Sequence, residues 1–294
     1  MLMAAGQFGE KDMSLGAIIQ ARTGSTRLPK KILLELPYNS GVTVLENIIA
    51  RAKKVKIIDK VIVATSTESE DDIVEVLCNR SQTICFRGDL EDVLERFYHA
   101  ASKHGLTTII RLTADNPCYD YQVIECAIRA HIENNNDYTT TENYPLGTNV
   151  EVLSFSALET CFQKASCQYE KEHVTPYIYK TEPNEFKIRT ISSLAGNGDL
   201  RLTLDTKDDY LFQCAIYDNL YSSNSCFGID EIINLLKKKS WVKKLNNETY
   251  QKKIFSNIKE EIVEAMRILE LYEMTNVKKY LETLLETKID MKTS

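Results

Sequence analysis

The chain has 294 residues and is 43% hydrophobic, enough to bury the core of one large domain or of a domain with an appendage. Its 36 basic and 42 acidic residues give a net charge of −6, which argues against nucleic acid or an anionic membrane as a partner. Eight scattered cysteines, no export signal and no apolar run near the roughly 20 residues of a membrane span favour a reducing cytoplasm.

Alternation of apolar and amphipathic segments predicts an open α/β sheet. Residues 1–13 have no periodic pattern and are expected to form a flexible leader. Strands are predicted at 16–20, 60–64, 83–86 and 107–112, and helices at 44–54, 71–78, 91–104 and 121–133. Strands that alternate with helices of this length form parallel crossover units, so we expect helices on both faces of the sheet.

The second half of the chain gives weaker signals. An irregular, insertion-like region is expected at 137–190, then a strand at 200–204 and helices at 207–221 and 229–239. Beyond Trp241, apolar residues recur about every four positions, which predicts a helical tail. We therefore expect a main domain at 14–244 and a helical extension at 245–294, which either packs on its own domain or joins two copies as a homodimer.

The most informative segment is 20–31, directly after the first predicted strand. It contains four cations, three hydroxyl groups and one glycine: Arg22, Arg27, Lys30, Lys31, Thr23, Ser25, Thr26 and Gly24. Backbone N–H groups in such a turn, flanked by guanidinium groups, suit a triphosphate. The segment is neither a Walker loop nor a dinucleotide fingerprint. A solvated basic loop is the alternative, but its position at the carboxyl end of a strand favours phosphate binding.

Two aspartates, Asp115 and Asp205, follow apolar segments predicted as strands and are therefore expected at the same rim of the sheet. Mg²⁺ binds a few hard oxygen ligands together with waters and substrate phosphates. Either aspartate alone would be interpreted as a helix cap or turn former. Beside a phosphate loop, the pair predicts a Mg²⁺ site that neutralises charge on the phosphorus under attack.

Several motifs occur in a fixed order along the chain. They include Gln-Ala-Arg-Thr-Gly-Ser-Thr-Arg-Leu-Pro, Arg-Gly-Asp-Leu-Glu-Asp-Val-Leu and Thr-Ala-Asp-Asn-Pro, within the segments 18–29, 61–66, 87–94, 111–117, 149–152, 172–179 and 204–206. As a set they resemble the spore coat polysaccharide SpsF-like branch of the cytidylyltransferase family. That family is related to the enzymes that activate Kdo and N-acylneuraminate as CMP-sugars. The resemblance covers roughly residues 14–239.

The resemblance implies a GT-A-like (Rossmann-like) nucleotide-diphosphosugar transferase fold with a mostly parallel mixed sheet. It implies a Mg²⁺-dependent nucleotidyltransferase that joins CMP from CTP to a sugar or sugar-acid acceptor for surface polysaccharide or glycoconjugate biosynthesis. Pyrophosphate would be released.

The resemblance also implies roles for individual residues. The nucleotide would contact Gln20, Ala21, Arg22, Gly24, Ser25, Thr26, Arg27 and Lys31, of which Arg22, Ser25, Arg27 and Lys31 would meet the triphosphate. Thr65, Ser66, Arg87 and Gly88 would approach the base and ribose. Catalysis would depend on Arg22, Arg27, Lys31 and Asp115. Mg²⁺ would be held by Asp115 and Asp205. The acceptor would face Glu151, Glu172, His173 and Arg201.

Some alternatives remain open at this point. Lys30 stands where relatives commonly have glycine, which leaves the backbone conformation of the loop undetermined. His173 is either a general base for the acceptor hydroxyl or a structural histidine. A GT-A glycosyltransferase would release a nucleoside diphosphate instead of pyrophosphate. A non-catalytic nucleotide-binding assembly subunit would show no metal-dependent turnover.

Overall fold

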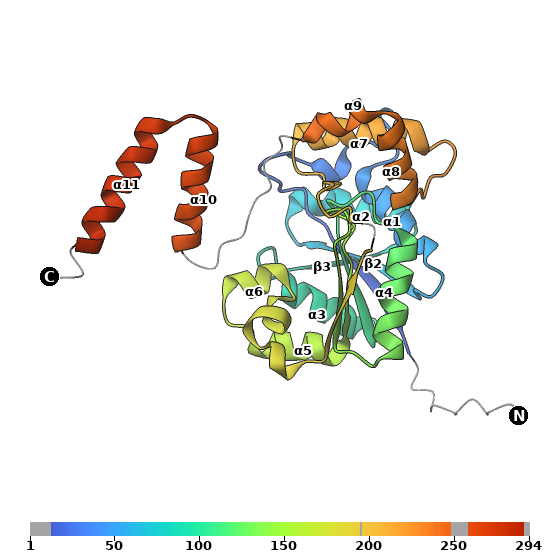
Figure 1. The fold of residues 1–294 in the computed structure, drawn as a ribbon. Coiled ribbons are helices and arrows are strands. Elements are labelled where there is room, and N and C mark those ends of the chain that lie inside the picture. Colours follow the sequence, from blue (N-terminus) through green and yellow to red (C-terminus); the bar gives the residue numbers. More distant parts are fainter. Residues whose placement is uncertain (1–12, 195, 248–257, 291–294) are drawn as a thin grey trace, which may run out of the picture. The chain divides into compact units, whose positions relative to one another are not determined.

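The computed structural model describes residues 13–194, 196–247 and 258–290 (Figure 1). The chain divides into two compact units, Met1–Thr249 and Tyr250–Ser294, whereas the sequence led us to expect a boundary after Lys244. The leader expected at 1–13 lies, except for Met13, outside the described residues. In the described part of the chain, no helix has both the length and the apolar content needed to cross a bilayer.

The first unit is built on a seven-stranded sheet in the order β3-β2-β1-β4-β6-β5-β7. The strands are β1 (Leu15–Gln20), β2 (Lys60–Ser66), β3 (Ile84–Gly88), β4 (Thr108–Thr113), β5 (Tyr138–Glu142), β6 (Glu151–Ser154) and β7 (Ile188–Ser192). β6 pairs antiparallel with β4 and β5, and the other neighbouring strands pair in parallel. The predicted α/β class with a mostly parallel mixed sheet is therefore confirmed.

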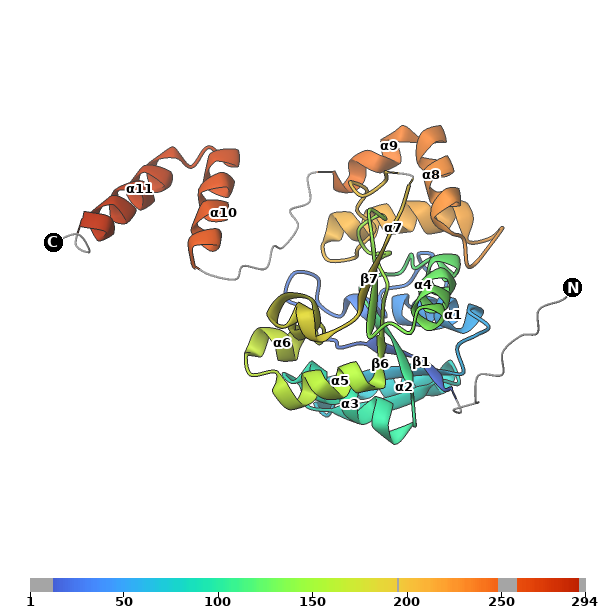
Figure 2. The same ribbon diagram turned by 60° about the horizontal axis from the view of Figure 1, so that its bottom comes forward.

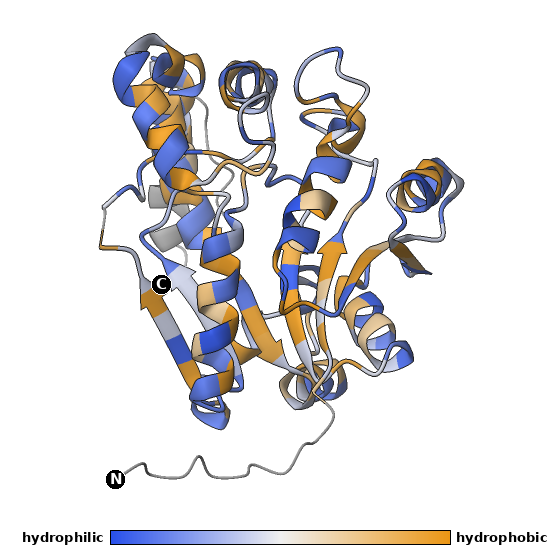
Figure 3. Cartoon of the chain, turned by 90° about the vertical axis from the view of Figure 1, so that its right-hand side faces the viewer, coloured by the Kyte–Doolittle hydropathy of each residue, from blue (hydrophilic) through white to orange (hydrophobic). Residues whose placement is uncertain are grey.

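Helices cover both faces of this sheet. Along β1, Ala17 and Ile19 belong to one buried cluster and Ile18 to the other, as expected when side chains alternate between faces. The first cluster includes residues of α1 (Val44–Lys54), α2 (Asp72–Arg80), α4 (Tyr121–Glu133), α7 (Lys207–Leu220) and α8 (Ile229–Lys238). The second includes residues of α3 (Val93–Lys103) and α5 (Phe155–Lys164). Figure 2 shows α1 and α4 on the opposite side of the strands from α3 and α5, and Figure 3 shows the mainly apolar strands between them.

The remaining elements are short or belong to the second unit. In the first unit they are η1 (Lys31–Leu33), η2 (Ser69–Asp71), α6 (Gln168–His173), η3 (Tyr177–Thr181), η4 (Pro183–Glu185), α9 (Ser240–Lys243) and η5 (Lys244–Asn246). The second unit contains α10 (Ile258–Leu271) and α11 (Thr275–Asp290), within the expected helical extension.

Side-chain caps determine where several helices begin. Thr43 and Thr206 form capping boxes at α1 and α7, and Asp92 and Asp120 cap α3 and α4. Because Asp92 is the cap, α3 starts at Val93, later than the expected residue 91.

Two expectations about the second half of the chain are wrong. The region 137–190 contains β5, β6, α5, α6 and part of β7. β5 was missed because its Thr-rich sequence has no apolar alternation, although Thr139 and Thr141 are buried. The strand expected at 200–204 is not part of the sheet, and its pairing in the described residues is an isolated bridge between Leu146 and Arg201. The leucines at 200, 202 and 204 are buried by packing.

The strand order identifies the ligand-binding edge. The chain continues from β1 to β2 on one side of β1, whereas β4 lies on its other side. This reversal is a topological switch point, where open α/β sheets bind ligands outside the carboxyl ends of the strands. The β1–β4 register pairs Gln20 with Thr113, so the segments that follow these two residues leave the sheet side by side.

The segment after β1 contains a left-handed residue. Lys30 has φ 55° and ψ 29°, and its N–H donates to the carbonyl of Thr23 at 3.1 Å. Glycine adopts this conformation freely, whereas a side chain with a Cβ atom is disfavoured there. Lys30 therefore retains the type of backbone conformation that a glycine would allow.

We predict that Lys30→Gly is more stable than Lys30→Ala, by about 1 kcal/mol or less in the free energy of unfolding. Both changes remove the charge, but only glycine removes the Cβ strain, which its greater entropy in the unfolded chain partly offsets. Urea denaturation of both variants measures the difference. An alanine variant as stable as the glycine variant would contradict the claim of strain.

The end of the first unit leads to a truncation prediction. Asn246 is 6% exposed and donates to the carbonyl of Arg201 at 3.2 Å and to Oδ1 of Asp209 at 3.1 Å. We expect a chain ending at Asn247 to keep the melting temperature of the first unit. A chain ending at Lys244 should lose about 1–3 kcal/mol, because it leaves both partners without this amide. Thermal melts of the two truncations compare them, and equal stability would contradict a stabilising role for Asn246.

Candidate functional site

The phosphate loop, which we define as residues 20–31, is fixed near its start by a buried carboxylate. The backbone N–H and Oγ1 of Thr23 each donate to Oδ1 of Asp71 at 2.8 Å, and Ser66 Oγ donates to the other oxygen at 2.5 Å. Burial opposes ionisation of Asp71, but the hydrogen bonds from Ser66 and Thr23 hold the pKa of this carboxyl below its usual range. Arg22 and Arg27 lie on either side of the anchor and are exposed.

The end of the loop lies against the two aspartates predicted from the sequence. Lys31 Nζ is 3.0 Å from Asp115 Oδ2 and 2.8 Å from Asp205 Oδ1. Arg27 Nη2 is 3.2 Å from Asp205 Oδ2. The structure therefore brings together four predicted residues from three separate segments. Asp115 and Asp205 together are called the acidic pair below.

Asp205 is held in position by a buried network. Arg201 is 3.1 Å from Asp205 and 2.9 Å from Asp209, which is fully buried and also accepts the backbone N–H of Asp205 at 3.0 Å. Burial opposes ionisation, but Lys31 and the neighbouring arginines hold the pKa of Asp205 below its usual range. Arg201 was predicted to face the acceptor, but its guanidinium group is ion-paired with these two carboxylates.

The acidic pair has the donor chemistry that Mg²⁺ needs. Oxygens from both carboxylates converge on one cationic group, the ammonium of Lys31. Within the described part of the chain, no three His, Cys, Asp or Glu side chains form a cluster suited to a metal. Two carboxylates fit Mg²⁺ provided that substrate phosphates and waters complete its ligands.

Glu151, the second residue predicted to face the acceptor, lies in another buried network. It is ion-paired with Arg111 and accepts hydrogen bonds from Tyr138 and, at 2.8 Å, from Thr175. Burial opposes its ionisation, but Arg111 holds the pKa of Glu151 below its usual range. Arg111 also donates to Gln20 Oε1 at 3.1 Å. Glu151 therefore orients Gln20 through Arg111, and its own oxygens are occupied.

The residues predicted to approach the base and ribose hold the β2–α2 connection together. Thr65 and Ser66 are fully buried. Arg87 donates to the carbonyls of Ser66 and Glu68 at 3.0 and 2.9 Å, and it is paired with Asp72 at 2.7 Å. The structure thus gives these side chains a supporting position behind the phosphate loop.

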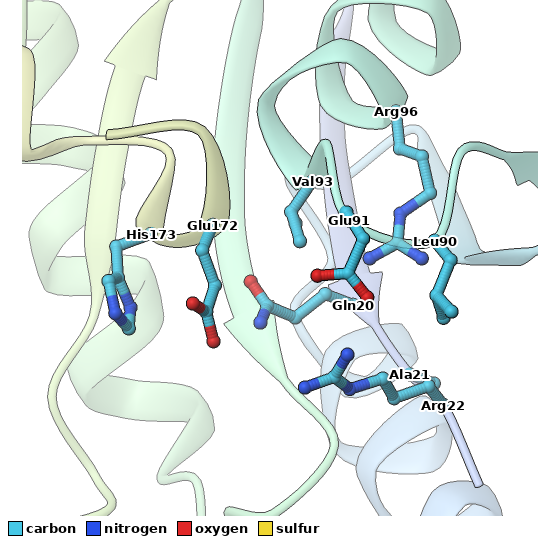
Figure 4. A pocket seen from close by; sticks show the side chains of 9 residues that line it. All are labelled: Gln20, Ala21, Arg22, Leu90, Glu91, Val93, Arg96, Glu172 and His173. Atoms are coloured by element: carbon cyan, nitrogen blue, oxygen red, sulfur yellow. The ribbon is translucent and has the colours of Figure 1, made fainter. Parts of the chain in front are cut away.

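A cavity of about 90 Å³ lies next to the phosphate loop (Figure 4). We call it the two-arginine cavity; its lining residues are Gln20, Ala21, Arg22, Leu90, Glu91, Val93, Arg96, Glu172 and His173. Gly88 is required beside it, because a Cβ atom there would lie 2.8 Å from Arg96 Cγ. The ring of His173 is 4.9 Å from that of Tyr169. Its role as base or structural residue stays a prediction.

Four residues of this region were not identified from the sequence: Asp71, Arg96, Arg111 and Asp209. Two of them carry a signal that was available. Arg111 is a charge inside an apolar strand, and Asp209 completes a capping signature three residues after Thr206. Asp71 resembles an ordinary helix start, and Arg96 an ordinary charged helix position, until tertiary contacts bury them.

Comparisons with known proteins agree with this architecture. The family model for cytidylyltransferases matches residues 16–268. An uncharacterized protein of Methanocaldococcus jannaschii, MJ1063, is 39% identical over 245 residues, covering 82% of this chain and 97% of its own. The spore coat polysaccharide biosynthesis protein SpsF of Bacillus subtilis is 36% identical over 226 residues, covering 75% and 93%.

Solved structures have the same fold. A cytidylyltransferase from Leptospira borgpetersenii is 28% identical and superimposes with a TM-score of 0.73, covering 83% of this chain and 99% of its own. A CMP:2-keto-3-deoxy-manno-octonic acid synthetase complexed with CTP has a TM-score of 0.51 at 16% identity, covers 66% of this chain and 93% of its own, and shares the fold alone. With the family model spanning most of the chain and SpsF aligned over most of its own length, the protein belongs to the SpsF-like cytidylyltransferase family.

Proposed function

We propose that this enzyme transfers CMP from CTP to a hydroxyl group of a sugar or sugar-acid acceptor and releases pyrophosphate. The observation that carries the proposal is the contact of Lys31 with the acidic pair at the β1–β4 switch point, with Arg27 beside it. This edge presents fixed cations for phosphates and carboxylates for a divalent metal at one place. Family membership and the relative SpsF support a role in polysaccharide biosynthesis.

The proposed reaction is an in-line displacement at the α-phosphorus. The acceptor hydroxyl oxygen forms a bond to this phosphorus and passes its proton to a general base, for which His173 is the candidate, while the bond from the α-phosphorus to the bridging oxygen of pyrophosphate breaks. Negative charge develops on the leaving pyrophosphate. Arg27 and Lys31, at the end of the phosphate loop, are the donors that would stabilise that charge.

Mg²⁺ is proposed as the cofactor, held by the acidic pair, where it would neutralise charge on the CTP phosphates. The ammonium group of Lys31 could then pair with either of two anions, the acidic pair or the triphosphate. Lys31 is paired with both Asp115 and Asp205, so both carboxylates are directed at one cation. We therefore infer that Lys31 transfers to a phosphate oxygen when substrate and metal bind.

A direct experiment tests the function. The four nucleoside triphosphates are screened against pooled sugar acids and sugar phosphates, with pyrophosphate release as the measurement. We expect release with CTP, and a larger rise in melting temperature with CTP than with ATP, GTP or UTP. Preference for GTP would overturn the cytidylyl assignment. Release of a nucleoside diphosphate from a nucleotide sugar would favour a glycosyltransferase, and no turnover would favour a binding subunit.

For the metal site, we predict that Asp115→Asn and Asp205→Asn remove most turnover and raise the Mg²⁺ concentration needed for half-maximal rate. An amide keeps the shape but not the charge that binds Mg²⁺. Asp218→Asn, on the exposed side of α7, is the matched control and should change neither quantity. Unchanged Mg²⁺ dependence in both acidic-pair variants would exclude them as metal ligands.

For the phosphate loop, Arg27→Lys should lower kcat/KM for CTP roughly ten- to a hundredfold, because an ammonium cannot replace the planar fork of a guanidinium. The melting temperature without ligand should change little, since the Arg27 side chain is 38% exposed. Arg129→Lys, on the exposed surface of α4, is the control. If Arg27→Lys lowers the ligand-free melting temperature together with activity, Arg27 is structural.

A further inference from the structure

Arg96 is a buried cation, and two of its guanidinium nitrogens have no hydrogen-bond partner among the described residues. It lies in the first turns of α3 and is 2% exposed. Considering only the residues that the structure describes, its Nε and Nη1 atoms have no hydrogen-bond partner. Burial of these two nitrogens destabilises the folded state, because no hydrogen bond within the protein replaces those that they would make to water. A ligand that supplies acceptors would remove this cost.

The unpartnered guanidinium borders the two-arginine cavity, and a second one faces it. Arg22 lines the same cavity from the end of β1 (Figure 4). Burial lowers the pKa of Arg96, and the nearby charge of Arg22 lowers it further. Asp71, Asp89 and Asp92 act in the opposite direction without reversing the shift. Two guanidinium groups around one small space are best satisfied by an anion between them.

The other lining groups indicate what kind of anion fits. Glu91 and Glu172 also line the cavity, and their carboxylates accept hydrogen bonds from hydroxyl groups. Because Gln20 Oε1 accepts from Arg111, the amide nitrogen of Gln20 is the atom available to donate into the cavity. The two glutamates would repel a polyphosphate, which carries several negative charges, more strongly than a single carboxylate. A neutral sugar would leave both arginines unsatisfied.

We propose that Arg96 is a substrate-binding residue which, with Arg22, binds the carboxylate of a polyhydroxy-acid acceptor in the two-arginine cavity. This inference rests on the proposed function and narrows its acceptor to the acids. The acceptor hydroxyls lie toward Glu91 and Glu172, while the cations Arg27 and Lys31 serve the nucleotide.

The test is Arg96→Met, with Arg129→Met as the matched loss of one arginine from an exposed position. Methionine fills the space of the arginine stem beside Gly88 and removes the unpartnered charge. We expect the ligand-free melting temperature of Arg96→Met to rise, and the melting shift produced by CTP to stay unchanged. Calorimetry should show binding of the probe D-gluconate to the wild-type chain weakened roughly ten- to a hundredfold in Arg96→Met. D-glucitol, the same chain without the carboxylate, should bind neither protein detectably.

Several outcomes overturn the inference. A lower ligand-free melting temperature in Arg96→Met would assign Arg96 a structural role. Loss of the CTP shift with unchanged gluconate binding would assign it to the nucleotide. Equal binding of D-gluconate to wild type and Arg96→Met, or no binding to either, would remove the acid site. Pyrophosphate release from CTP with only neutral acceptors would keep the proposed function and overturn this inference alone.

Discussion

The site depends on one ionic contact, the ammonium of Lys31 between the carboxylates of Asp115 and Asp205. These residues are 84 and 174 positions from Lys31 in the chain. The contact therefore connects the segments that follow β1 and β4 with the segment that precedes α7. Because both carboxylates contact the same ammonium group, they are positioned to share one cation. The same constraint makes this point suitable for a substrate-bound metal.

Buried groups behind this contact orient the exposed ones. Asp71 anchors the phosphate loop through Thr23, and Asp209 holds both Arg201 and the backbone of Asp205. These carboxylates already have hydrogen-bond partners within the protein, so they do not need a ligand to supply them. The exposed arginines can then reach a substrate from a fixed backbone, which lowers the ordering cost of binding.

Arg96 differs from the other buried charges of the site. Asp71, Glu151 and Asp209 each receive several hydrogen bonds within the protein, whereas Nε and Nη1 of Arg96 receive no acceptor from the described residues. Gly88 gives the arginine stem the room to lie against β3. The fold thus positions a cation at the cavity and leaves its hydrogen-bonding capacity to a ligand, a local loss of stability typical of functional sites.

The sequence by itself determined the α/β class, the strand-end positions of the phosphate loop and Asp115, and the helical extension. These follow from periodicities of two and 3.6 residues and from local turn chemistry. It did not reveal β5, whose Thr-rich pattern lacks apolar alternation, and it suggested a strand at 200–204 that packing alone buries. Only the tertiary structure decided that Glu151 and Arg201 are committed to ion pairs and that Arg96 borders a cavity. Which distant residue pairs with a given charge depends on the order of the strands in the sheet. The spacing of residues along the chain does not encode that order.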